Sequence, residues 1–221
     1  MRRGSVRRTV GVMPRRPPID PQGTYHVGSR GVYGRTLFED VGQHEVFLRM
    51  YTRVARKYAW ETLEWALVEN HHHFVIRLSQ GGLSEGWREI HGGYSRWFHL
   101  IHGETRQGHL FRHGFFGRQL KTDAQVIAAC RYVSLNLLRS RSRPTPRKDD
   151  WGGYGAVVGL THPRSFHSPH ALLELLAPRP AAARKMYRDL VREEHGRRRQ
   201  VPSPNDVPWD PWSGDVVESA A

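Results

Sequence analysis

The stretch that most constrains the fold is Asn70-His71-His72-His73-Phe74-Val75-Ile76-Arg77-Leu78. It follows a hydrophobic segment, residues 63–68, and runs into apolar residues that favour β-structure, so we interpret it as a strand. Side chains alternate between the two faces of a strand, which places His71 and His73 on one side, about 7 Å apart along the chain. Neutral imidazole is a common ligand of divalent ions, and two such ligands can share one ion. The alternative is a polar loop tip that happens to be rich in histidine.

The segments around this strand predict an α+β fold. Strand patterns and helical periodicities alternate along the chain in the order strand, helix, strand, strand, helix, strand. The expected segments are residues 25–31, 41–58, 60–68, 72–78, 83–102 and 117–121. This is the β-α-β-β-α-β order of a ferredoxin-like antiparallel sheet, with the histidine pair on a central strand.

A third helix is expected at residues 123–141 and carries Tyr132 and Asn136 four residues apart, on one face. The apolar stripe of this helix lies about a quarter-turn away and consists of Val126, Cys130, Val133 and Leu137. We therefore expect Tyr132 and Asn136 to be half-exposed, as the lip of a site would be. The amide oxygen of Asn136 suits Mg²⁺ or Mn²⁺, and open positions on the ion would take a phosphate oxygen. A positioned tyrosine hydroxyl is a covalent nucleophile, and a phosphotyrosine link would keep the bond energy for rejoining.

Charge and composition point to a polyanionic partner. The 221 residues carry 34 Lys and Arg against 21 Asp and Glu, a formal net charge of +13. Such an imbalance favours nucleic acid, and no apolar run approaches the roughly 18 residues of a membrane-spanning helix. The basic start of the chain lacks the apolar core of a signal peptide. Cys130 is the only cysteine, which excludes an intramolecular disulfide and a cysteine zinc cluster. We expect a cytoplasmic, nucleoid-associated protein of bacterial type, without a membrane partner.

Composition also predicts how the chain is divided. Residues 1–19 are rich in Arg and Pro without periodicity and are expected to be a basic flexible arm. Residues 20–160 hold the segments described above and form the main domain. Residues 161–199 contain two short helical patterns and are expected to be a C-terminal helical extension. Pro, Ser and Asp dominate residues 200–221, for which a disordered tail is expected.

The motifs, taken together, resemble those of a known group of enzymes. Asn70–His73 and the apolar residues after it resemble the HUH motif, in which U is usually a bulky apolar residue. Tyr132-Val133-Ser134-Leu135-Asn136 resembles the Tyr-x-x-x-Asn helix of the HUH single-strand transposases. Residues 25–31, 108–111 and 151–159 are similar to the REP-associated tyrosine transposases, which are IS200-like. The similarity covers about residues 17–195, and the motifs occur in the expected order.

This resemblance implies a metal-dependent single-stranded DNA endonuclease and strand transferase that cleaves through a 5′-phosphotyrosine. Its relatives recognise hairpins formed by repetitive palindromic elements. It implies Tyr132 as the catalytic nucleophile, a divalent cofactor, Mg or Mn, and as metal ligands His71, His73 and Asn136. The chain departs from the family pattern at two positions. His72 occupies the U position and would point to the opposite face, and Leu137 stands where the family commonly has proline.

Further residues are candidates for DNA contacts. Arg30, Arg112 and Arg118 adjoin the proposed site segments and could bind phosphates. His109 lies in an aromatic and basic stretch. With His113 it has a spacing that could bind zinc on a helix, but glycines on both sides favour a DNA-contacting loop instead.

Other functions remain open at this point. The same chemistry would serve a replication-initiator or relaxase-like HUH nickase, although those often carry paired tyrosines or a helicase partner. A catalytically silent hairpin-binding protein is a different class, and it would need none of the site residues. The sequence does not decide between a monomer and a homodimer, nor whether the tyrosine serves its own subunit.

Overall fold

The computed structural model describes residues 18–103, 108–112, 114–139, 151–199 and 217–218. It confirms the expected β-α-β-β-α-β order of the main elements. These are β1 Thr24–Arg30, α1 Val41–Lys57, β2 Glu61–Val68, β3 His71–Arg77, α2 Leu83–His102 and β4 Phe116–Leu120. A 3₁₀ turn, η1 Val32–Gly34, follows β1, and the third helix expected from the sequence is α3 Asp123–Arg139.

The strands form one sheet in the order β2-β3-β1-β4-β5, and every pair is antiparallel. The chain is therefore an α+β protein with a ferredoxin-like sheet, and β3, which carries the histidines, is an inner strand. The last strand, β5 Val217–Glu218, pairs with the outer edge of β4. Residues 217–218 are the described part of the segment for which a disordered tail is expected, and the rest of that segment lies outside the described residues. A strand edge offers unpaired N–H and C=O groups to a nearby extended segment.

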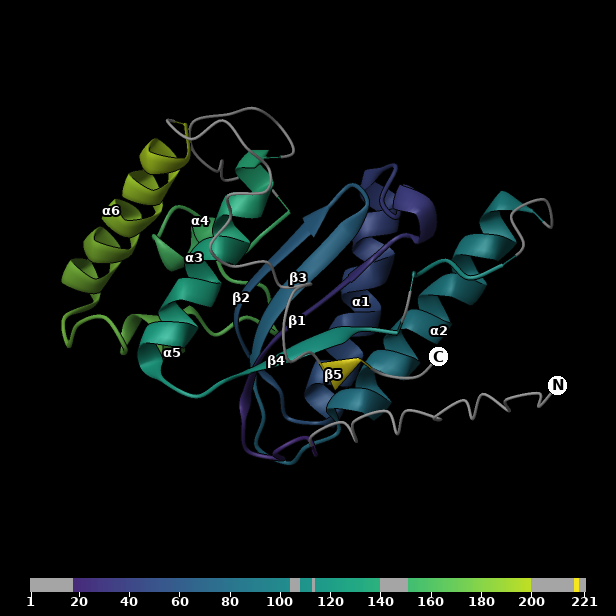
Figure 1. Cartoon of the computed structure of the whole chain (residues 1–221), viewed down its shortest axis with the longest axis horizontal. Helices are drawn as coiled ribbons and strands as arrows, with labels where there is room; N and C mark the ends of the chain where they lie inside the picture. The colour runs from purple at the N-terminus through teal and green to yellow at the C-terminus, as the bar shows by residue number, and fades with distance from the viewer. Residues whose placement is uncertain (1–17, 104–107, 113, 140–150, 200–216, 219–221) are drawn as a thin grey trace, which may run out of the picture.

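Two helical layers cover the two faces of the sheet (Figure 1). Helices α1 and α2 pack on one side over an aromatic core that includes Phe47, Phe74 and Trp87. Helix α3 packs on the other side with the C-terminal helices, over a smaller and more aliphatic core. We call these sides the α1–α2 face and the α3 face. Successive residues of β3 alternate between them, so the direction of each histidine decides which core it enters.

Hydrogen bonds at the helix ends explain where the helices start and stop. The Asp40 side chain accepts from the Gln43 backbone N–H at 2.8 Å, as an N-cap should. Thr122 caps α3 in the same way, accepting from the Gln125 N–H at 3.2 Å. Helix α2 ends at His102 and is followed by Gly103, whose positive φ of 71° glycine adopts at little cost.

The C-terminal part of the chain closes the edge of the sheet at β2. It contains α4 Tyr154–Val157, α5 Pro169–Leu173 and α6 Pro180–Arg199. The stretch before α4, expected to be irregular, pairs with the edge strand: Trp151 accepts from the Leu67 N–H at 2.8 Å. Pairing of this kind protects an edge strand from other chains. Among the described helices, none is long and apolar enough to cross a membrane.

Candidate active site

Two of the three consecutive histidines lie side by side on the α3 face. The ring centres of His71 and His73 are 5.1 Å apart. His73 is 1% exposed, and Val75, the next residue of β3 with the same orientation, belongs to the core beneath α3. The expectation that the pair projects from one side of a strand is confirmed, and the alternative of a polar loop tip is wrong.

Each of these rings is held through its Nδ1 atom. His71 Nδ1 lies 2.8 Å from the Asn70 side-chain oxygen, which can only accept, so His71 donates. His73 Nδ1 lies 3.1 Å from Nε2 of His26 on β1. A partner at Nδ1 fixes the orientation of the ring, as metal-binding histidines require. Sequence reasoning missed His26, although its place in β1, one residue from Tyr25 in the opposite core, could have revealed it by alternation.

Burial and a nearby positive charge keep His26 neutral, and a glycine beside it leaves space for the ring of His73. Burial lowers the pKa of His26 to about 3, and the positive charge of Arg118 adds to the effect. A neutral imidazole can accept a hydrogen bond from His73. Gly28 pairs directly with His73 across β1 and β3. A side chain at Gly28 would collide with Phe116 and would come within 2.8 Å of His73 Nδ1, so glycine at this position leaves room for both rings.

Tyr132 lies directly over this pair of strands. Its ring centre is 5.5 Å from that of His73 and 5.7 Å from that of His26, in edge-to-face contacts. The expectation of a half-exposed lip is wrong, because Tyr132 and Asn136 are only 8% and 5% exposed. Helix α3 is enclosed by the sheet on one side and by the C-terminal helices on the other, so more than its apolar stripe is buried (Figure 1).

The direction of α3 across the sheet determines which strand residues it meets. Ser134 bonds Glu64, while Leu137, further along α3, lies against Gly152, which bridges to Ala66 further along β2. Helix α3 therefore runs parallel to β2 and antiparallel to β3.

This direction matches the spacing of the two motifs. Tyr132 and Asn136 are separated by about 6 Å along a helix, and His73 and His71 by about 7 Å along a strand, in opposite chain directions. Since Tyr132 lies against His73, Asn136 comes to the level of His71. The Asn136 amide nitrogen donates to the Tyr132 carbonyl at 2.9 Å. The amide oxygen therefore points away from this hydrogen bond.

The donor set fits a divalent ion. An imidazole nitrogen binds such an ion at about 2.1 Å, so two rings that share it have centres roughly 4.5–5.2 Å apart at ligand angles of about 90–110°. The observed 5.1 Å between His71 and His73 lies in this range. Among the described residues, no group of three or more His, Cys, Asp or Glu could hold a metal. A third ligand supplied by the described residues would therefore be of another type, and the amide oxygen of Asn136 is suitable for Mg²⁺ or Mn²⁺.

His72 points into the opposite core, as expected from its place between the other two. It is fully buried, stacks on Trp87 with ring centres 4.9 Å apart, and lies 2.9 Å from Nε2 of His91. Burial lowers the pKa of His72 well below its ordinary value. His72 is therefore a neutral core residue, and it does not disturb the placement of His71 and His73 on the α3 face.

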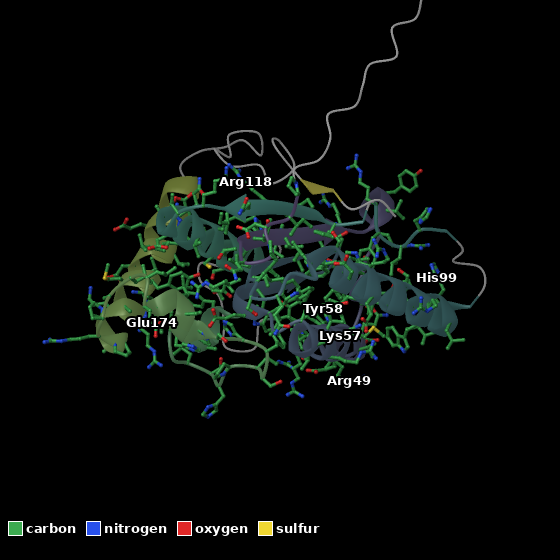
Figure 2. The ribbon with its side chains drawn as sticks, turned by 90° about the horizontal axis from the view of Figure 1, so that it is seen from below. Arg49, Lys57, Tyr58, His99, Arg118 and Glu174 are labelled. Atoms are coloured by element: carbon green, nitrogen blue, oxygen red, sulfur yellow. The ribbon has the colours of Figure 1, made fainter. Side chains whose placement is uncertain are left out.

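The candidate DNA contacts fall into two places. Arg30 pairs with His71 at the end of β1, and its carbonyl accepts from the Arg112 N–H at 2.8 Å, so these two exposed residues are neighbours. His109 is exposed in the same non-helical segment, which excludes the helical zinc spacing in the part described; His113 lies outside the described residues. Arg118 pairs with His26 from β4 and so lies on the α3 face (Figure 2).

The fold and the site define an α+β protein in which paired histidines of a central strand face a helix-borne tyrosine. Residues 21–136 match the family described as "Transposase IS200 like". Because this match spans more than half of the chain, the protein belongs to the IS200-like transposase family, as the resemblance of its motifs indicated. The chain matches no curated relative.

A solved structure shares the fold. It is described as "Structure of the REP associates tyrosine transposase bound to a REP hairpin", and the chain is 16% identical to it, with a TM-score of 0.54. The similarity covers 68% of this chain and 88% of that one. At this identity the likeness concerns the fold alone.

Proposed function

We propose that the protein is a metal-dependent single-stranded DNA endonuclease and strand transferase that acts on hairpin-forming repeat DNA. One observation carries this proposal: the Tyr132 ring lies 5.5 Å from His73, on the sheet face where His71 and His73 lie 5.1 Å apart. Family membership and the fold shared with a hairpin-bound REP-associated transposase support it.

The site residues have distinct roles in this proposal. His71, His73 and Asn136 would hold Mg²⁺ or Mn²⁺, which would supply positive charge to neutralise a phosphodiester under attack. Asn70 and His26 orient the two histidines through Nδ1. The oxygen of Tyr132 attacks the phosphorus and loses its proton. The bond from phosphorus to the 3′ oxygen breaks and that oxygen takes up a proton in place of the one lost by Tyr132, which leaves a 5′-phosphotyrosine and a 3′ hydroxyl. Attack by another 3′ hydroxyl reverses these steps and joins the strands.

Basic residues supply the affinity for DNA. Arg30 and Arg112 are exposed at the end of β1 next to the His71 pairing position, and His109 lies in the same segment. Arg118 lies on the α3 face beside His26. With a formal net charge of +13 on the chain, phosphate contacts of this kind provide sequence-independent attraction. Recognition of a particular repeat needs base contacts in addition.

The test is covalent trapping. Labelled single-stranded hairpins from the DNA that flanks the gene are incubated with the protein in Mg²⁺, Mn²⁺ or EDTA, and denaturation-resistant adducts are resolved on a gel. We expect a metal-dependent adduct whose linked peptide, mapped by mass spectrometry, contains Tyr132. Substitution of both metal histidines, His71→Ala with His73→Ala, should abolish it. Tyr58→Phe is the matched control, since Tyr58 follows α1 and packs against the core on the opposite face of the sheet.

The outcomes separate the classes of function. Binding without an adduct, across several hairpins and both metals, would show a silent hairpin-binding protein. An adduct at Tyr132 with an unstructured single strand, but none with hairpins, would favour a replication-initiator or relaxase-like nickase. An adduct at another tyrosine would overturn the assignment of the nucleophile.

A further inference from the structure

A buried polar cluster joins the helix that carries Tyr132 to the C-terminal helix. Ser134 of α3, Tyr187 of α6 and Glu64 of β2 are each fully buried. Their oxygen atoms form a closed triangle: Ser134 Oγ lies 3.0 Å from Glu64 Oε2, Tyr187 OH lies 3.1 Å from the same atom, and the two hydroxyls are 2.9 Å apart. Buried polar groups cost stability unless paired, so this cluster holds three elements to fixed positions.

A bulge in β2 directs Glu64 into this cluster. Thr62 faces α1, where its hydroxyl lies 2.7 Å from Tyr51 OH, and strict alternation would send Glu64 to the same side. The β2–β3 register shifts between Thr62 and Glu64, so Leu63 and Glu64 both face α3. Bulges commonly re-aim a side chain in this way beside a site.

The number of hydrogen atoms favours a neutral Glu64. If Glu64 is ionised, the hydroxyls of Ser134 and Tyr187 offer two hydrogens for three oxygen–oxygen contacts. If Glu64 is protonated, three hydrogens serve three contacts and the ring is complete. The other carboxyl oxygen, Oε1, accepts from the Trp65 N–H at 3.0 Å in either state. Burial, the largest effect, raises the pKa of Glu64 to about 7, which agrees with this count.

Ser134 stands between the two residues of the catalytic helix motif. It lies two residues after Tyr132 and two before Asn136. We propose that Glu64, Ser134 and Tyr187 form a clamp that sets the rotation and axial position of α3, so that the C-terminal helix positions the nucleophile and the third metal ligand. The clamp residues act through α3 and are positioning residues. This inference rests on the proposed function for its effect on cleavage.

The decisive variant is Tyr187→Phe, which removes one hydroxyl and keeps the ring. We expect the single-turnover cleavage rate at saturating hairpin to fall at least tenfold, while the hairpin Kd changes less than twofold. Hydrogen exchange of amides 124–137 should rise, and that of α1 should not. The matched control is Tyr51→Phe: Tyr51 is equally buried and its hydroxyl bonds β2 from the opposite face. It should lower stability without slowing cleavage.

Substitutions of Glu64 separate positioning from simple packing. Glu64→Gln keeps an oxygen acceptor and supplies N–H donors in place of the acid proton, so it should restore most of the cleavage rate that Glu64→Leu loses. If Tyr187→Phe and Glu64→Leu cleave at the wild-type rate with unchanged exchange in α3, the clamp proposal is wrong. If the wild type forms no adduct with any hairpin, the proposed function fails, and exchange in α3 still decides whether the clamp holds the helix.

Discussion

Strand β3 contributes one histidine to a buried histidine pair on each of its two faces. His73 bonds His26 at 3.1 Å on the α3 face, and His72 bonds His91 at 2.9 Å on the α1–α2 face. Burial lowers the pKa of both His26 and His91 to about 3, so each is neutral. The two pairs differ in the side chains that surround them. His91 stacks on Phe111 at 4.0 Å within an aromatic core, whereas His73 adjoins a second histidine and a tyrosine. Burial and pairing are alike in the two pairs, so neither can identify a functional histidine.

Removing one tyrosine hydroxyl on each face distinguishes most clearly the face that supports cleavage from the face that supports only stability. Tyr132→Phe should lower adduct formation by at least about 10³-fold, since a positioned nucleophile has no substitute, and hairpin affinity should persist. Tyr94 lies on the opposite face and donates to the Leu37 carbonyl at 2.6 Å. Tyr94→Phe should cost about 1–2 kcal/mol of unfolding free energy and leave cleavage intact. Gel trapping and urea unfolding measure both, and equal loss of cleavage in the two variants would contradict the functional division of the faces.

Each histidine pair can be disrupted by replacing the member that does not belong to β3, and the effects of the two substitutions can be compared. His26→Leu removes the Nδ1 partner of His73 and should weaken the metal by roughly 10- to 100-fold, as loss of an outer partner does. His91→Leu removes the partner of His72 and should leave metal affinity unchanged. The measurement is the Mn²⁺ concentration that half-saturates cleavage, together with the rise in Tm on adding Mn²⁺. If His26→Leu and wild type bind Mn²⁺ equally, the His26–His73 bond has no part in holding a metal.

The same substitution predicts a change in acid stability. His91 has a pKa of about 3 in the folded protein and about 6.5 when unfolded, so between these values the unfolded state binds the extra proton. Stability therefore falls as pH drops from 6.5 toward 3, by about 2 kcal/mol from this group between pH 7 and pH 5. His91→Leu should be less stable at pH 7 but lose about 2 kcal/mol less on acidification. Urea unfolding at both pH values tests this, and an unchanged loss would show that His91 is not neutral in the folded protein.

Periodicity and alternation predicted most of the fold and the faces on which the main candidate site residues lie. The strand containing His71 and His73 was predicted from the apolar residues that follow it, and Tyr132 and Asn136 share a helix face by spacing alone. The burial of Tyr132 was not predictable, because it depends on helix α6 packing over α3 from more than 40 residues away. Periodicity on one helix describes one apolar stripe and cannot report a second covering layer.

The clamp was beyond sequence reasoning for a related reason. Glu64 faces α3 only because β2 has a bulge before it, and a bulge changes the facing of residues without changing the sequence pattern that predicts the strand. A charged residue in a strand is usually assigned to solvent, and Glu64 is fully buried. His26 is a different case, because alternation along β1 predicts the face on which it lies. Its hydrogen bond to His73 could not be predicted from the sequence.

The smallest expected effect concerns the charges that surround the two faces. Arg118 lies on β4 beside His26, and Arg49 is exposed on α1, on the opposite side of the sheet (Figure 2). Arg118→Ala should weaken hairpin binding a few-fold and lower the salt slope of the binding constant by about one, because one phosphate contact is lost. Arg49→Ala removes the same charge from the chain and should change neither quantity by more than the general loss of net charge. Fluorescence anisotropy across a salt series measures both. Equal slopes for the two variants would mean that DNA responds to the overall charge of +13 and not to a path along the α3 face.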